Sequence, residues 1–267
     1  MARDPAGSAL GMRHALILGI FALGSFADLA TAAVATPERI QTYIRRLTTE
    51  PAEERYKLIR EIRQEAAPGA KHPPVKSSDR TDLLPVLEAA LENDDDRVRT
   101  EAICGLCYMK CRDTLPILEW SLESAYPTVR YYACMGLLWL ADEPDLRERV
   151  SAGLEKAQTR PGEAFGVRLH ASASLDELGV KQEDTIFIEA LRNPRANAAQ
   201  AATVLARMRR KDTIELMVVR LKTAVPSTDH WLSLALRDLT GEDFGTNAET
   251  WQRWLDVNRA ALPEQIK

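Results

Sequence analysis

The 267-residue chain has little of what most enzyme active sites and metal centres are built from. It holds four histidines, four cysteines and 6% aromatic residues, and its 13 glycines form no phosphate-binding loop. A His-Glu-x-x-His sequence, a nucleophile elbow and a P-loop are also missing from it. The sequence therefore predicts no catalytic residue, no metal site and no cofactor.

The sequence also has no excess of positively charged residues. Lysine and arginine number 35 against 39 aspartates and glutamates, which gives a net charge of −4 and a pI near 5.7. A nucleic-acid-binding protein normally carries a basic surface that meets the phosphates. The charge balance therefore argues against a nucleic-acid partner.

Long hydrophobic runs are missing except at the N-terminus. Residues 15–26 are apolar, Arg13 precedes them, and a stretch of small residues, 30–35, follows. This three-part layout is typical of a secretory signal peptide, and cleavage after Ala32 or after Ala35 is compatible with it. A bilayer span needs about 20 apolar residues, so a retained anchor is the weaker alternative. After cleavage no membrane span is predicted.

The sequence leaves the first residue of the leader open between Met1 and Met12. A start at Met12 rather than Met1 would give a shorter and more basic beginning. Either start predicts export, to the periplasm or the extracellular space.

Two consecutive stretches, residues 84–106 and 115–137, have the same pattern at a fixed offset of 31 residues. Each begins Leu-Pro-(Val/Ile)-Leu-Glu, with apolar residues at three- and four-residue steps that predict a helix. The polar run 93–96 ends the first helix, and Asp95 or Asp96 is suited to cap the second. In the other copy Pro127 lies where the first turn of the second helix is expected. Helix pairs repeated at such a period predict an α-solenoid.

A family resemblance rests on the second helix of each pair. The pattern Val-Arg-x-x-Ala-x-x-(Gly/Ser)-Leu occurs at 98–106, 129–137 and 167–175. It resembles the second helix of HEAT repeats, including the HEAT-like class first associated with bilin lyases. The resemblance covers about residues 81–182 and implies an all-α solenoid of stacked antiparallel helix pairs. It also implies two functions, a binding scaffold or a bilin-lyase-like enzyme or chaperone of a chromophore protein.

The C-terminus has its own pattern, in which Gly241 and Gly245 allow turns and Thr246 with Glu249 predicts a capping box. It is similar to the Leu-Thr-Gly, Phe-Gly, Trp-x-x-Trp ending of bacterial exported HEAT-repeat proteins. Two tryptophans, at 251 and 254, are expected to cover the apolar face of the last repeat, and a tryptophan clamp for a ligand is the alternative. The predicted organisation is a signal peptide (1–35), an N-terminal helix pair (36–66), a Pro/Gly/Ser loop (67–80), a HEAT-like repeat array (81–245) and a C-terminal cap helix (246–267).

The cysteines are the sharpest local feature. Cys104, Cys107 and Cys111 follow each other at three- and four-residue steps, which predicts one stripe along the helix, on the side away from its core residues. Cys134 belongs to the next repeat, and stacking brings it near. Three interpretations stay open: a disulfide between neighbouring repeats, small hydrophobic residues, and a redox or metal-binding module.

The register of the second helices also predicts a binding surface. Its members flank the core stripe and give the middle of the face an aromatic and thioether character, which suits a protein or peptide partner. They are Glu101, Tyr108, Tyr132, Met135, Trp139 and His170. The alternative is that Tyr132, Met135 and Trp139 pack between repeats. The favoured function is a non-enzymatic exported scaffold that binds its partner on the concave face, in an oligomeric state that the sequence does not set.

Overall fold

A computed structural model shows that the regular secondary structure of the described residues is helical throughout, which confirms the predicted all-α class. It describes residues 34–69, 74, 77–193, 196, 198–209 and 211–262. Residues 1–33 of the predicted leader, with both candidate starts, lie outside these ranges, so export stays a prediction. None of the helices in these ranges is both long and apolar enough to cross a membrane. The described residues form two compact units, 34–178 and 179–262.

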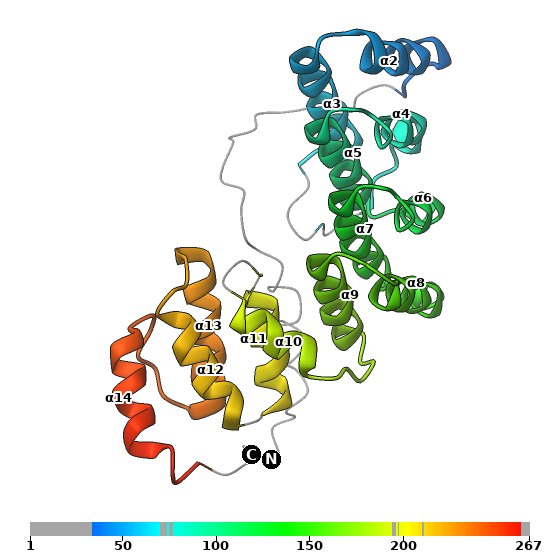
Figure 1. Ribbon diagram of the computed structural model, residues 1–267. Helices are drawn as coiled ribbons and strands as arrows, with labels where there is room; N and C mark the ends of the chain where they lie inside the picture. The colour runs from blue at the N-terminus through cyan, green and yellow to red at the C-terminus, as the bar shows by residue number, and fades with distance from the viewer. Residues whose placement is uncertain are drawn as a thin grey trace, which may run out of the picture. The chain divides into compact units, whose positions relative to one another are not determined.

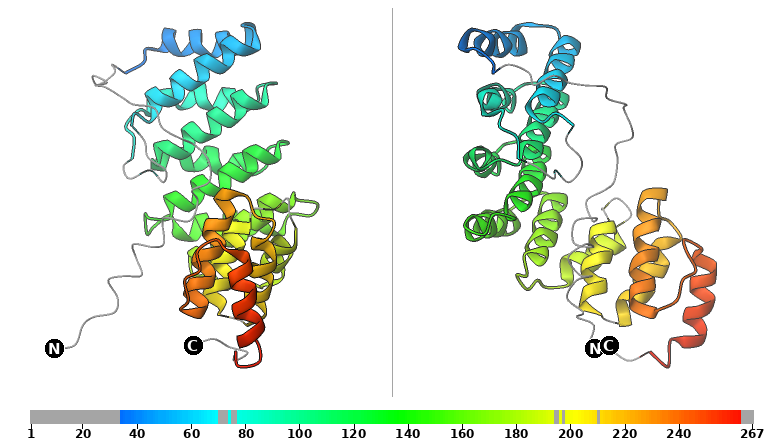
Figure 2. Two further views of the ribbon diagram at one scale, coloured as in Figure 1. Left: turned by 90° about the vertical axis from the view of Figure 1, so that its left-hand side faces the viewer. Right: turned by 180° about the vertical axis from the view of Figure 1, so that it is seen from behind.

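The first unit is a stack of helix pairs. Figure 1 shows the first helices of the pairs in one layer and the second helices in the other, and Figure 2 shows the same two layers from behind. The second helices pack directly on one another, α3 on α5, α5 on α7 and α7 on α9. The helices are α2 (Pro37–Thr49), α3 (Ala52–Ala66), α4 (Leu84–Ala90), α5 (Asp96–Met109), α6 (Leu115–Ser121), α7 (Pro127–Leu140), α8 (Arg147–Thr159) and α9 (Phe165–Glu177).

Local sequence sets where these helices begin. The Thr36 hydroxyl caps α2 by accepting the Arg39 N–H at 3.3 Å, and the Asp95 carboxylate caps α5 by accepting the Arg97 N–H at 2.9 Å. Helix α7 begins at Pro127, whose missing N–H costs nothing in a first turn. The predicted cap at Asp95 and the predicted helix start at Pro127 are confirmed.

Two glycines let the second helices lie close to their neighbours. A Cβ added to Gly136 of α7 would lie 2.7 Å from Cys107 Sγ and 3.0 Å from both terminal methyl carbons of Leu118. A Cβ on Gly105 of α5 would lie 3.0 Å from a methyl carbon of Leu87. The small residues of the repeat pattern are therefore needed for the packing of the layers.

The arginine of the Val-Arg pattern links one repeat to the next. In α5 the buried Arg99 guanidinium donates to the Asn93 carbonyl in the turn of its own repeat. Its Cζ also lies 3.5 Å from the ring centroid of Tyr126, in the corresponding turn of the following repeat. The side chain therefore ties two successive turns together.

One repeat later, Arg130 makes the equivalent bridge. Its Nη1 donates to the Ser124 carbonyl at 2.6 Å, and Ser124 lies 31 residues after Asn93. Its other nitrogens reach the carboxylate of Glu163, in the next turn. The arginine of the repeat pattern therefore marks a position that links successive turns of the stack.

The second unit continues the same architecture within itself. Helices α10 and α11 form one pair and α12 and α13 another, with α10 packed on α12 and α11 on α13. The last helix packs on α12, so it extends the layer of first helices. These elements are α10 (Thr185–Arg192), α11 (Ala198–Met208), α12 (Lys211–Leu221), α13 (Pro226–Thr240) and α14 (Ala248–Asn258).

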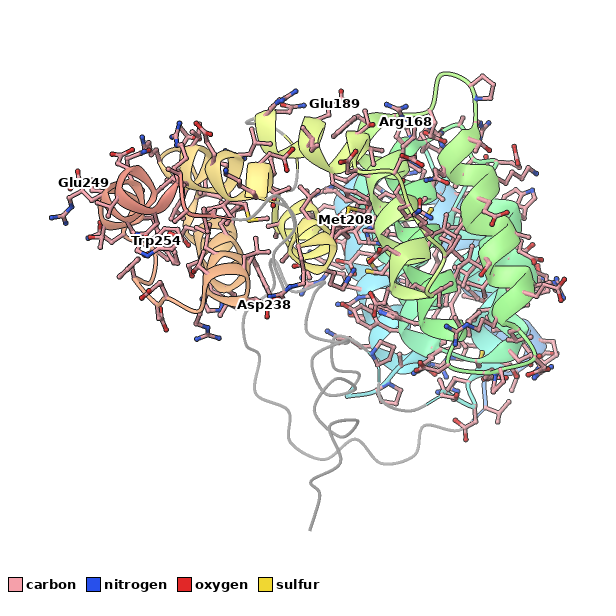
Figure 3. The ribbon with its side chains drawn as sticks, turned by 90° about the horizontal axis from the view of Figure 1, so that it is seen from below. Arg168, Glu189, Met208, Asp238, Glu249 and Trp254 are labelled. Atoms are coloured by element: carbon pink, nitrogen blue, oxygen red, sulfur yellow. The ribbon has the colours of Figure 1, made fainter. Side chains whose placement is uncertain are left out.

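The start of α14 differs from the predicted capping box. Asn247 is the cap, its Oδ1 accepting the Thr250 N–H at 2.9 Å, so the box of Thr246 with Glu249 is wrong by one residue. Trp251 is buried against Phe244, with ring centroids 4.8 Å apart, and its Nε1 donates to the Gly245 carbonyl at 2.8 Å. Figure 3 labels Glu249 and Trp254 on the same helix, the first exposed and the second half-buried.

Candidate functional site

The face formed by α3, α5, α7 and α9 holds all six residues predicted to bind a partner. Glu101, Tyr108 and Tyr132 are partly exposed, whereas Met135, Trp139 and His170 are buried. A side chain that is buried in this conformation presents no area to a partner. Met135, Trp139 and His170 are therefore part of the packing. The binding role of Glu101, Tyr108 and Tyr132 stays a prediction.

Aromatic rings connect three of these helices. The ring centroids of Tyr108 (α5) and Trp139 (α7) lie 5.7 Å apart, and those of Tyr131 (α7) and His170 (α9) lie 4.5 Å apart. Tyr131 also meets Tyr132 edge to face at 5.4 Å. Such pairs stabilise beyond their buried area. We call Tyr108, Tyr131, Tyr132, Trp139 and His170 the aromatic strip.

An ion pair borders the aromatic strip on the side of α3. Arg63 Nε donates to Glu101 Oε2 at 2.5 Å, and the Arg63 guanidinium carbon lies 5.8 Å from the centroid of the Tyr108 ring. Both charged side chains are partly exposed. Arg63 is not evident from the sequence pattern because it precedes the recognisable repeats. Its position on α3, the second helix of the first pair, is the signal that would have found it.

The two partly exposed tyrosines of the aromatic strip, Tyr108 and Tyr132, are neutral. Burial raises the pKa of the Tyr108 hydroxyl to about 12, and it also raises the pKa of Tyr132. Both hydroxyls are therefore protonated and uncharged at physiological pH. With Arg63 and Glu101 at the edge, the face combines aromatic area with one charge of each sign.

The cysteines lie elsewhere than predicted. Helix α5 ends at Met109, and Lys110 adopts a left-handed conformation with φ 44°, so Cys111 lies beyond the helix and not on a straight stripe. Cys107 is buried against α7, where its Sγ lies 3.2 Å from the Tyr132 carbonyl. The prediction that the stripe faces away from the core is wrong for Cys107, because α5 is covered by α7 as well as by α3 and α4.

All four cysteines fall within the described part of the chain, and all four are unpaired thiols there. Burial is the main cause that raises the pKa of each, to about 12 for Cys104 and Cys134. Among the described residues, no group of histidine, cysteine or carboxylate side chains is arranged to hold a metal ion.

Comparisons with known proteins leave the chain without a family assignment. No family model matches it, and no curated protein does. It is similar to the crystal structure of an engineered protein from a structural genomics consortium, with 17% identity, a TM-score of 0.41 and coverage of 79% of this chain and 97% of that one. It is also similar to the complex of CpcE and CpcF of phycocyanin lyase from Nostoc sp. PCC7120, with 16% identity, a TM-score of 0.39 and coverage of 90% and 98%. At these values neither likeness assigns an activity or a partner.

Proposed function

We propose that the chain is a non-enzymatic, exported repeat scaffold that binds a protein or peptide through the face formed by its second helices. The observation that carries this proposal is the partly exposed pair Tyr108 and Tyr132, on adjacent helices, with the ion pair of Arg63 and Glu101 beside Tyr108. Tyrosine and arginine belong, with tryptophan, to the residue types most enriched among interface hot spots, since they combine large contact area with directed hydrogen bonds.

The experiment is a capture of binding partners from the exported fraction of the source cells, with the purified protein as bait. The test variant is Tyr108→Ala/Tyr132→Ala. The matched control is Trp120→Ala, because Trp120 is 47% exposed but lies on α6, in the other layer. Thermal unfolding is measured for each bait to show that it is folded.

We expect a partner that is captured by the wild-type protein and by Trp120→Ala. The double tyrosine variant should lose at least tenfold in affinity, which corresponds to about 1.4 kcal/mol. Equal capture by all three baits, or a loss confined to Trp120→Ala, would contradict the proposed face. Bilin transfer to an acceptor protein by the purified chain would contradict the non-enzymatic assignment.

A further inference from the structure

Ala35, near the start of the described chain, is held by a largely buried carboxylate. Ala35 lies outside any helix, yet it is only 7% exposed, and its N–H donates to Asp82 Oδ2 at 2.7 Å. Its neighbour Val34 is 74% exposed. Ala35 is therefore held by a specific contact to a residue 47 positions away.

The receiving carboxylate is itself fixed by a chain of charged groups. Arg80 donates to both oxygens of Asp82, from Nε at 3.0 Å and from Nη2 at 2.9 Å. The same Nη2 reaches Glu65 Oε1 at 2.8 Å, and Glu65 Oε2 accepts from Arg39 of α2 at 2.8 Å. The Arg80 side chain is buried and the two carboxylates are nearly so. This network ties α2, α3 and the turn before α4 to the backbone of Ala35.

The sequence left two compatible leader cleavage positions, and only one of them keeps this contact. Cleavage after Ala35 would remove the donor from Asp82. It would also place the new α-ammonium group on Thr36, the N-cap of α2, where the helix dipole disfavours positive charge. Cleavage after Ala32 leaves Ala35 bonded and places the charge three residues before the cap.

We propose that Asp82 is the anchoring site of the mature N-terminus, and that the leader is removed by hydrolysis of the bond between Ala32 and Ala33. The step is an ordinary peptide hydrolysis by a signal peptidase. Water adds across the bond, which leaves a carboxylate on Ala32 and an ammonium group on Ala33. The cleavage half of this inference rests on the proposed export, whereas the anchoring half does not.

The cleavage is tested on the full chain, produced in a bacterial host that secretes through the general export route. The intact mass and the N-terminal sequence of the protein from the exported fraction are measured. The expected first residue is Ala33, and Thr36 as the first residue would overturn the proposal. A full-length protein retained in the cytoplasm would overturn the proposed export and the cleavage. The anchor is tested separately, by the thermal unfolding of two chains produced without the leader.

The anchor is tested by comparing the two candidate mature chains, produced without leader and beginning at Ala33 or at Thr36. We expect the Tm of the shorter chain to be lower by roughly 3–8 °C, the loss of one hydrogen bond to a charged acceptor. In a double-mutant cycle, Asp82→Asn should lower the Tm of the longer chain more than that of the shorter one.

The control is Val34→Ala in the longer chain, which changes an exposed side chain and should leave the Tm within about 1 °C. Equal Tm values for the two chains would overturn the anchor. So would an equal effect of Asp82→Asn in both, since the substitution would then act only through Arg80.

Discussion

Arg130 and Glu163 form a bidentate ion pair between neighbouring repeats. Arg130 Nε donates to Glu163 Oε2 at 2.8 Å, and Arg130 Nη2 donates to Glu163 Oε1 at 2.6 Å. The Glu163 side chain is 0% exposed, and its Oε1 also accepts the Ala164 N–H at 2.7 Å. The pair lies at the turn before α9, so it joins that turn to α7. A buried pair of this kind is costly to break, because one partner is left charged and unpaired.

Glu163→Gln is therefore expected to destabilise the protein by about 3 kcal/mol, since the buried Arg130 guanidinium loses its counter-charge. Urea unfolding followed by circular dichroism measures the change. Glu119→Gln is the matched control: Glu119 also pairs with an arginine 30 residues away, Arg149, but that pair is exposed and its loss should cost under about 1 kcal/mol. Equal losses for the two variants would show that burial does not set the strength of these bridges.

The same pair predicts a dependence of stability on pH. Burial by itself would raise the pKa of the Glu163 carboxyl, but the hydrogen bonds from Arg130 and from the Ala164 N–H outweigh it and hold the pKa below its ordinary value of 4.5. A lowered folded-state pKa means that the contribution is present above about pH 4.5 and is lost as the pH falls through the folded-state pKa. The difference in unfolding free energy between the wild type and Glu163→Gln should therefore be full at pH 7 and shrink below pH 4. A difference that stays constant over this range would rule out the carboxylate as its source.

Helix starts could be predicted from the sequence where the residues that determine them lie within one helical turn. The cap at Asp95 and the helix start at Pro127 follow from side chains that act within one turn, so a single repeat contains the information. Asn247 was missed in favour of Thr246 because both residue types cap helices, and only the backbone geometry separates adjacent candidates.

Burial on the second-helix face was harder to predict because it depends on how closely the repeats stack. Periodicity assigned one buried side to each second helix, but α7 packs on α5, α6, α8 and α9, so Trp139 and Met135 on its flanks are also covered. Gly136 is one cause of this close packing of α7, since its missing side chain leaves room for the Cys107 thiol. A pattern of small residues predicts close approach, but it does not say which neighbour approaches.

Gly136→Ala tests that close approach. The added Cβ would meet Cys107 Sγ at 2.7 Å, so we expect a loss of about 1–2 kcal/mol despite the better helix propensity of alanine. The same substitution in a Cys107→Ala background should cost less, because the sulfur is gone. Gly166→Ala is the matched control in α9, where no atom lies within 4 Å of an added Cβ, and it should stabilise by up to about 1 kcal/mol. A loss at Gly166 as large as that at Gly136 would indicate a backbone effect in place of the contact.

Thiol reactivity separates the three interpretations of the cysteines. Burial raises the pKa of Cys104 and Cys134 to about 12, which lowers their thiolate fraction at pH 8 by roughly 1,000-fold relative to an ordinary cysteine. In native protein purified without reductant, a thiol reagent should therefore react very slowly, and in guanidinium chloride all four thiols should react at once. Val257→Cys is the positive control, since Val257 is 81% exposed and the new thiol should react in the folded state at the ordinary rate. Fewer than four thiols in the denatured protein would mean that a disulfide joins two of the cysteines. A fast-reacting cysteine in the native protein would favour a redox role. Slow reaction in the native protein, with all four thiols counted after denaturation, identifies the cysteines as small hydrophobic residues of the stack.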